Sequence, residues 1–265
     1  MNQKISPKKS LGQNFLTNQK AILEIVNAGE IKKGENILEI GPGKGALTEK
    51  LLETGGKVLA IEKDRDLIWF LNEKFAKEIE KGDLTVKEGD ILELDPKNLF
   101  KNQEYKIIAN IPYYITGAII EKFLSTDQKP LKMVLLVQKE VAERMIARDK
   151  KESILSLATK FYGTPKLVYR VSAGSFFPKP KVDSAVISIN IDNKKVNKKE
   201  EEIYLNIIKK SFAHKRKMML GNLKTEIKEI DWEKIFEELN INKKVRAEDL
   251  SKDDFLKITN KILNN

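Results

Sequence analysis

Hydrophobic and polar positions along the first 192 residues follow two alternating patterns. Apolar runs of four to eight residues are typical of buried strands, and apolar residues spaced three and four apart are typical of amphipathic helices. The pattern predicts strands at residues 35–40, 57–62, 84–89, 105–110 and 131–138. Helices are expected between or after them, at 20–28, 46–53, 64–79, 117–125 and 138–148. Strands that alternate with helices predict an α/β fold with a doubly wound, mostly parallel sheet.

The pattern changes towards the C-terminus. Residues 165–171 and 182–191 are expected to add two strands that close the sheet as an antiparallel pair. The polar run at 192–202 is interpreted as a linker, and the residues beyond it have helical periodicity without a comparable strand signal. We therefore expect two domains, 1–192 and a small all-helical C-terminal domain at 193–265.

Charge is unevenly distributed along the chain. The formal net charge is +10, from 49 Lys and Arg residues against 39 Asp and Glu residues. Residues 1–20, 153–182 and 203–225 are basic and contain no acidic residue at all. A uniformly solvated, Lys-rich surface is the alternative, but segregated positive charge favours a polyanionic partner such as nucleic acid.

Some kinds of chemistry are excluded by composition. The chain has no cysteine and a single histidine, His214, so a Cys-based site, a His-rich metal site and a His-based triad are ruled out. Residues 1–10 lack the apolar core of a signal peptide, and no run of about 18 apolar residues occurs. We expect a cytoplasmic protein with neither a metal nor a membrane partner.

A glycine-rich segment joins the first predicted strand to a helix. In Glu39-Ile-Gly-Pro-Gly-Lys-Gly-Ala46, the glycines allow a tight turn and a close approach of ligand to backbone. Glu62 ends the next strand, 21 residues beyond Gly41, where a carboxylate can accept hydrogen bonds from ribose hydroxyls. Gly41, Gly43 and Ala46 also satisfy the dinucleotide-binding pattern, so this segment alone leaves an NAD site open.

Two further strand ends favour S-adenosyl-L-methionine over NAD. Asp90 follows the third predicted strand, where it can accept the amino hydrogens of the cofactor adenine, and Asn110 ends the fourth. Together with Glu39 and Glu62, they place one polar group at each of four successive strand ends. Open α/β sheets bind ligands at that edge.

Asn110-Ile111-Pro112-Tyr113 suits chemistry on an amino group. The Asn110 carboxamide oxygen and the Ile111 carbonyl can accept both hydrogens of an exocyclic amine, Pro112 fixes the turn, and Tyr113 can stack on the base. The segment resembles the [DNS]-[PIL]-P-[YF] signature of amino-directed nucleic-acid methyltransferases. The alternative is that Asn110 caps a turn and the tyrosines are core residues.

A second aromatic wall is expected from the segment SFFPKPKVDSA. A target base must leave its stack to reach such a pocket, which is easiest in single-stranded or loop RNA. We expect Phe176 to stack on the flipped base, although packing of Phe176 or Phe177 in the core is the competing interpretation.

Nearly the whole chain resembles the ribosomal RNA adenine dimethyltransferases, and most closely the branch that acts on small-subunit rRNA. GQNFL and PKVDSAV are the more specific of the motifs that carry the resemblance. The others are EIGPGKGALT (39–48), AIEKD (60–64), GDILELD (89–95), NIPYYIT (110–116) and QKEVAERM (138–145).

The resemblance implies a class I (Rossmann-like) methyltransferase domain at 1–192 and a helical rRNA-docking domain at 193–265. It implies dimethylation of the N6 amines of two adjacent adenosines in the 3′-terminal hairpin loop of 16S rRNA, by a monomer acting on an immature 30S subunit. The implied cofactor contacts are Asn14, Leu16, Gly41, Glu62, Asp90 and Asn110.

Two basic segments are candidates for phosphate contacts. Lys8 and Lys9 flank GQNFL, although a disordered basic tail is equally compatible with them. Lys215, Arg216 and Lys217 belong to AHKRK, for which a solvated helix face is the alternative.

Three other functions are compatible with parts of the pattern. The erythromycin-resistance branch methylates one 23S rRNA adenosine with the same motifs, but FFPKPKVDSAV and AHKRKMMLGNL match the small-subunit branch better. A noncatalytic RNA-binding assembly factor would not need the intact set Gly41, Glu62, Asp90 and Asn110. An NAD-dependent oxidoreductase would need a hydride-transfer partner acid, which the sequence lacks.

Overall fold

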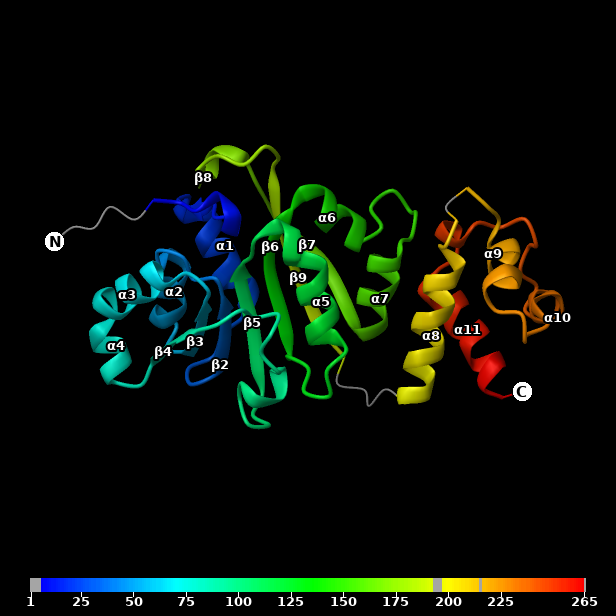
Figure 1. The fold of residues 1–265 in the computed structure, drawn as a ribbon, viewed down its shortest axis with the longest axis horizontal. Coiled ribbons are helices and arrows are strands. Elements are labelled where there is room, and N and C mark those ends of the chain that lie inside the picture. The colour runs from blue at the N-terminus through cyan, green and yellow to red at the C-terminus, as the bar shows by residue number, and fades with distance from the viewer. Residues whose placement is uncertain (1–5, 193–196, 215, 265) are drawn as a thin grey trace. The chain divides into compact units, whose positions relative to one another are not determined.

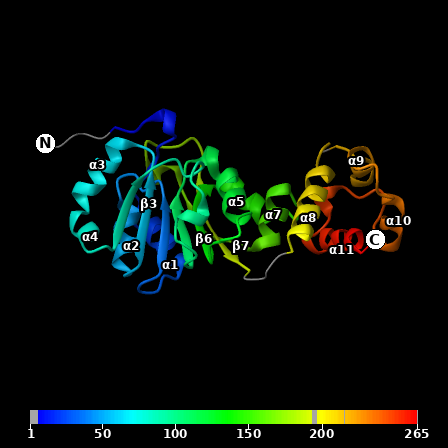
Figure 2. The same cartoon turned by 60° about the horizontal axis from the view of Figure 1, so that its bottom comes forward.

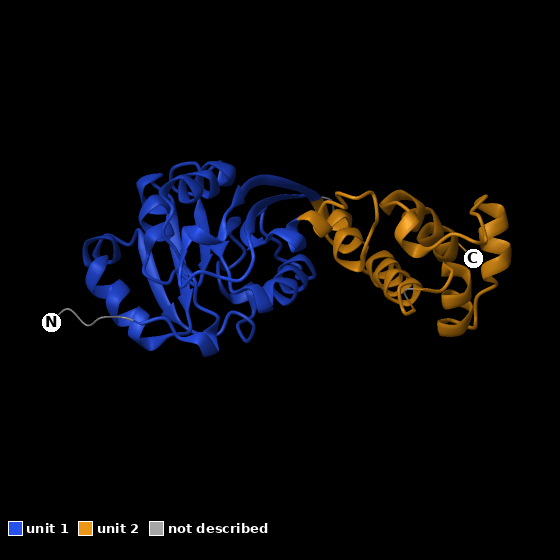
Figure 3. Ribbon diagram, turned by 90° about the horizontal axis from the view of Figure 1, so that it is seen from above, with its two compact units in different colours: residues 1–142, 164–192 blue, residues 143–163, 193–265 orange. Residues whose placement is uncertain are grey.

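The computed structural model describes residues 6–192, 197–214 and 216–264. It divides into two compact units, residues 1–142 with 164–192, and residues 143–163 with 193–265 (Figure 3). Residues 143–163 were expected in the first domain. They group with the second because Leu157 is buried among the C-terminal helices.

The first unit is built on a seven-stranded sheet with the order β4-β3-β2-β5-β6-β9-β7 (Figure 1). The strands are β2 (Asn36–Ile40), β3 (Lys57–Glu62), β4 (Leu84–Glu88), β5 (Tyr105–Asn110), β6 (Lys132–Gln138), β7 (Gly163–Val171) and β9 (Ser184–Ile191). Neighbours among β2 to β6 are parallel, and β9 runs antiparallel to β6. The predicted α/β sheet is confirmed, and both ends of each strand lie within two residues of their predicted positions.

Helices cover the sheet because its strands are apolar along their length (Figure 2). They are α1 (Gln19–Gly29), α2 (Ala46–Glu53), α3 (Arg65–Lys74), α4 (Ala76–Glu80), α5 (Thr116–Leu124) and α6 (Lys139–Met145). One core cluster joins α1 and α2 to the sheet through Ile22, Ile25, Leu51, Ile108 and Val134. The helix expected at 64–79 is interrupted at Phe75, which separates α3 from α4.

A small second sheet was not predicted. β1 (Phe15–Leu16) pairs antiparallel with β8 (Phe176–Phe177), and Thr17 continues the contact by donating its N–H to the Ser175 carbonyl at 2.8 Å. Two-residue strands have too few positions to show a period of two. Figure 1 shows that this pairing brings the N-terminal segment beside the loop before β9.

The second unit is all helical. It contains α7 (Ile154–Tyr162), α8 (Lys198–Ser211), α9 (Met219–Glu226), α10 (Trp232–Glu238) and α11 (Lys252–Leu263) around a core that includes Tyr204, Trp232 and Phe255. The linker expected to reach residue 202 ends earlier. Asn197 caps α8, with its side chain accepting from the Lys199 N–H, and Glu200 and Glu201 lie favourably in the first turn.

Among the helices that the structure describes, none combines the length and the apolar character needed to cross a lipid bilayer.

Candidate active site

One pocket opens at the carboxyl edge of the parallel strands. β2 pairs with β3 on one side and with β5 on the other, so the chain reverses its direction of winding there. This is the position at which open α/β sheets bind ligands. The pocket is lined by nine of the residues predicted for cofactor or catalysis: Asn14, Leu16, Gly41, Glu62, Asp90, Asn110, Ile111, Pro112 and Tyr113.

The glycine-rich turn after β2 lines this pocket. Gly41 and Gly43 have φ values of 66° and 59°, in the left-handed region that other residues rarely adopt. A Cβ added to Gly43 would lie 3.0 Å from the ring of Phe15, which also lines the pocket. Larger residues would therefore strain the turn and push Phe15 away.

Glu62 is a buried carboxylate held in one orientation. Its Oε1 accepts the N–H groups of Lys63 and Asp64, both at 2.9 Å, and its Oε2 accepts that of Gly43 at 3.2 Å. Burial raises the pKa of Glu62 above its usual range, although these hydrogen bonds oppose the shift. A fixed carboxylate that lines a pocket is well suited to accept hydrogen bonds from a ligand's hydroxyl groups.

Asp90 lines the same pocket as Glu62. Its Oδ2 pairs with the Lys63 ammonium at 2.8 Å, and its Oδ1 accepts the Leu92 N–H at 2.9 Å. The Lys63 hydrogen bond is the main reason that the pKa of Asp90 is lowered. Asp90 therefore stays ionised at neutral pH and can accept hydrogens from a ligand.

Glu39 is the most deeply buried carboxyl group of the pocket. It is 1% exposed, and its Oε2 accepts the hydroxyl hydrogen of Thr48 at 2.7 Å. Burial raises the pKa of Glu39 to about 8, with the Thr48 hydrogen bond acting in the opposite direction. Burial therefore favours the neutral form of this group.

Asn110 is oriented by the N-terminal segment. Its Nδ2 donates to the backbone carbonyl of Asn14 at 3.3 Å. Because the amide nitrogen is engaged there, the carboxamide oxygen is the atom left to act as an acceptor in the pocket. No pattern in the sequence indicates this contact, since the two residues are 96 positions apart.

The two tyrosines that follow have different environments. The Tyr113 hydroxyl hydrogen-bonds the Oγ of Ser184, at the start of β9, at 2.5 Å. Burial raises the pKa of Tyr113, although the Ser184 hydrogen bond opposes the shift. Tyr114 is 68% exposed at the pocket rim, so neither ring has the purely core role that was the alternative.

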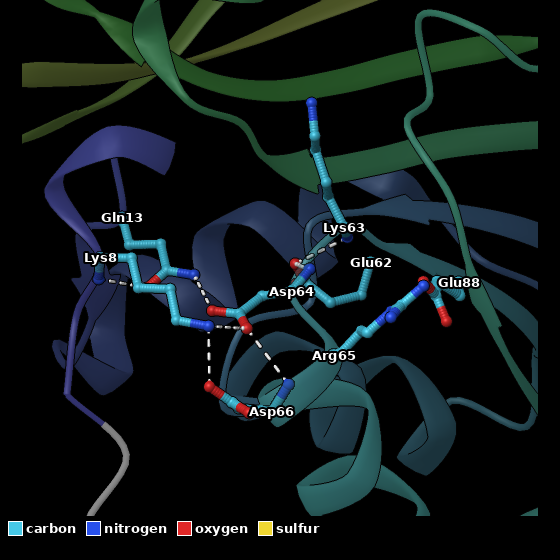
Figure 4. A network of polar contacts seen from close by, with 8 residues as sticks. All are labelled: Lys8, Gln13, Glu62, Lys63, Asp64, Arg65, Asp66 and Glu88. Carbon is cyan, nitrogen blue, oxygen red and sulfur yellow. Dashed lines mark hydrogen bonds and ion pairs between the residues drawn. The ribbon is translucent and has the colours of Figure 1, made fainter.

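The phosphate contact of Lys8 stays a prediction, and in this structure its side chain is engaged within the protein. Its ammonium lies 2.5 Å from Asp64 Oδ1 and 2.7 Å from Asp66 Oδ2 and forms an ion pair with each. Gln13 also donates to Asp64, at 2.8 Å. Figure 4 shows these side chains converging on Asp64, which caps α3. The cluster fastens the N-terminal segment beside the pocket, while Lys9 is exposed.

Phe176 is packed in the core, as the competing interpretation had it, rather than open for stacking in this structure. Its side chain is 5% exposed and belongs to the core cluster that contains Leu16, its β-pairing partner. Successive residues of a strand face opposite sides, and Phe177 is accordingly 61% exposed. Of the two rings, only Phe177 is accessible to a base in this structure.

The basic segment of the second unit is a loop rather than a helix face. Arg216 and Lys217 are exposed between α8 and α9, and Lys215 lies outside the described residues. The buried Asn222 donates to the carbonyls of Ser211 and His214, at 2.7 and 3.2 Å, and so fixes the start of this loop. Sequence reasoning did not single out Asn222.

The sheet order and the four polar groups at successive strand ends define a class I methyltransferase. The residues present fit S-adenosylmethionine, because a fixed carboxylate (Glu62), an ionised acid (Asp90) and an open glycine turn (Gly41) line one pocket. Comparison with known proteins agrees. The model of the family described as ribosomal RNA adenine dimethylase matches residues 4–264, and the chain belongs to this family.

Individual relatives cover almost the whole chain. The ribosomal RNA small subunit methyltransferase A of Fusobacterium nucleatum is 39% identical, over 95% of this chain and 96% of the relative. A dimethyladenosine transferase from Plasmodium falciparum has a TM-score of 0.80 at 27% identity, covering 94% and 98% of the two chains. The 23S rRNA methyltransferase ErmE has a TM-score of 0.76 at 23% identity, with coverage of 94% and 99%, and shows the shared fold. The protein is an S-adenosylmethionine-dependent methyltransferase.

Proposed function

We propose that this protein transfers methyl groups to the N6 amines of two adjacent adenosines in the 3′-terminal hairpin loop of 16S rRNA, dimethylating each. The observation that carries the proposal is the Asn110 carboxamide, which lies in the same pocket as Glu62 and Asp90 and has its nitrogen engaged by Asn14. Bound S-adenosylmethionine would supply an electrophilic methyl group. Glu62 would hold its ribose, Asp90 its adenine, and Asn14, Leu16 and Gly41 would complete the site.

Asn110 and Ile111 would prepare the amine for reaction. The exocyclic nitrogen of adenine is a weak nucleophile, because its lone pair is delocalised into the ring. Hydrogen bonds from the amine to the Asn110 Oδ1 and the Ile111 carbonyl would favour a pyramidal nitrogen with a localised lone pair. The contribution of these acceptors is positioning and electrostatic preorganisation, and no strong general base is required.

Tyr113 would provide the platform for the target base. Its ring lines the pocket beside Asn110, and its hydroxyl is tied to Ser184 rather than being free to rotate. A stack of a base on an aromatic ring contributes roughly 1–3 kcal/mol, which offsets part of the cost of taking the base out of its own stack.

The setting that we propose is small-subunit biogenesis in the cytoplasm. The protein would act as a monomer on an immature 30S subunit, and Arg216 and Lys217 in the second unit would contact rRNA phosphates. The relative at 39% identity is named for the small subunit, which favours 16S over 23S rRNA as the substrate.

Mass spectrometry of methylated rRNA tests the proposal. Purified immature 30S particles and protein-free 23S rRNA are incubated separately with the protein and labelled cofactor. We expect two adjacent dimethyladenosines in the 16S fragment and none in 23S rRNA. Label in 23S rRNA alone would identify the erythromycin-resistance activity, and no label in either would favour a noncatalytic assembly factor.

A further inference from the structure

Residues 176–184 form a segment that we call the arch, and both of its ends are fastened at the pocket. Phe177 pairs in antiparallel register with Phe15, which lines the pocket. At the other end, the Oγ of Ser184 hydrogen-bonds the hydroxyl of Tyr113, which also lines the pocket. The Ala173 N–H donates to the Asp183 carboxylate at 2.9 Å and closes the base of the arch.

The arch is too short to carry its side chains far from the pocket. An extended chain spans at most about 3.3–3.6 Å per residue. Lys179 is therefore within about 7 Å of the Phe177 Cα, and Lys181 within about 11 Å of the Ser184 Cα. Pro178 and Pro180 flank Lys179 and restrict the backbone, so the arch presents its side chains with little loss of conformational entropy.

The exposed side chains of the arch include an aromatic ring and two lysines, beside Val182 and Asp183. Phe177 is 61% exposed, and Lys179 and Lys181 are exposed as well. Within the part of the chain that the structure describes, neither lysine forms an ion pair. Asp183 is the one acid of the arch, and it is already occupied by the Ala173 N–H. Among the described residues, these three side chains form no hydrogen bond, ion pair or ring contact.

We propose that the arch is a binding site for the RNA nucleotide next to the target adenosine, with Phe177 stacking on its base and Lys179 and Lys181 contacting phosphates. This inference rests on the proposed function. When one base is withdrawn into the pocket, its neighbour loses a stacking partner, and an exposed ring at the pocket edge replaces it. Aromatic rings alternating with cations are the combination that holds unstacked single strands.

The site also gives a role to the second of two adjacent adenosines. While the first occupies the pocket, the other can rest on Phe177, one strand away from Phe15 and the pocket wall. A short shift of the strand along the arch then exchanges the two. The arch would thereby hold the RNA between successive methylations.

The test measures binding of the 16S hairpin to the protein by fluorescence anisotropy over a range of salt concentrations. We expect Phe177→Ala to raise the Kd about 5- to 150-fold, and Phe177→Trp to leave it close to wild type. The double variant Lys179→Ala/Lys181→Ala should reduce the slope of log K against log salt by about 1.4, for two lost phosphate contacts. Trp69→Ala, which removes a 51% exposed ring from α3, is the matched control and should change nothing.

Hairpins with an abasic nucleotide on the 5′ or 3′ side of the target identify the stacked base. When the abasic site replaces the base that stacks on Phe177, wild type and Phe177→Ala should bind the hairpin with the same Kd. The inference is wrong if the Kd of Phe177→Ala for the intact hairpin is within twofold of the wild-type value. It is also wrong if neither abasic site removes the rise in Kd that Phe177→Ala causes. The proposed function is tested separately, because it fails only if wild-type protein does not methylate the hairpin adenosines in 30S particles.

Discussion

The hydrogen bond between Tyr113 and Ser184 should set the orientation of the Tyr113 ring, which we propose as the platform for the target base. The two oxygens are 2.5 Å apart, and Ser184 is fully buried. Ser184 does not line the pocket itself, so its removal leaves the cofactor contacts in place. Tyr113→Phe, Ser184→Ala and the double variant together isolate the interaction.

The size of the expected loss in activity follows from the usual energy of a hydrogen bond. A typical intramolecular hydrogen bond contributes about 0.5–1.5 kcal/mol net, and a buried partner left unpaired costs about 1–3 kcal/mol. If the bond holds the ring in the orientation that a base requires, each single variant should lower kcat/KM for the hairpin by about 2- to 12-fold. The double variant should lose no more than the worse single variant, because the remaining hydroxyl no longer stays unpaired.

The assay is methyl transfer into the hairpin, with cofactor affinity measured by calorimetry on the same samples. We expect the Kd for S-adenosylmethionine to stay within twofold of wild type in all three variants. If the fold losses in kcat/KM of the two single variants simply multiply in the double variant, the coupling is refuted. Unchanged activity in both single variants would show that the ring is positioned by packing alone.

Other groups give predictions of their own. Glu62→Gln should weaken S-adenosylmethionine binding by about 10-fold or more in calorimetry, because hydrogen bonds to a charged group contribute about 1.5–3 kcal/mol. Burial raises the pKa of Glu39 to about 8, so this group binds more protons in the folded than in the unfolded protein. The free energy of unfolding should therefore fall as the pH rises from about 4.5 to 8. Glu39→Gln should therefore flatten the fall in urea stability over that range and make the cofactor-free protein more stable than wild type at pH 8. Arg216→Ala/Lys217→Ala should reduce the salt slope of RNA binding by about 1.4, and Asn222→Ala should weaken RNA binding in the same titration by releasing the loop that carries them.

The main sheet could be predicted because its signal is local. Ile37, Leu38 and Ile40, like the apolar residues of the other parallel strands, form short runs between glycines and polar turns. The spacing of Glu62 and Asp90 then placed them at one edge, since parallel strands end together. The main sheet and the strand ends that line the pocket therefore follow from local patterns in the sequence.

The contacts that could not be predicted join distant segments. Nothing around Lys8 indicates that its partners are Asp64 and Asp66, more than 50 positions away. Alternation predicts that Phe176 and Phe177 face opposite ways, but which of them is buried depends on the register of β8 against β1. That register is a tertiary contact, and the sequence of either strand alone does not specify it.

The central claim is that the Asn110 carboxamide oxygen holds the amine of the target adenine. Single-turnover methyl transfer by Asn110→Ala, with cofactor binding measured on the same sample, tests it most directly. If Asn110 is the amine acceptor, S-adenosylmethionine should still bind to the variant, and methyl transfer should fall by about 100-fold or more. Near-normal transfer by the variant would contradict the account.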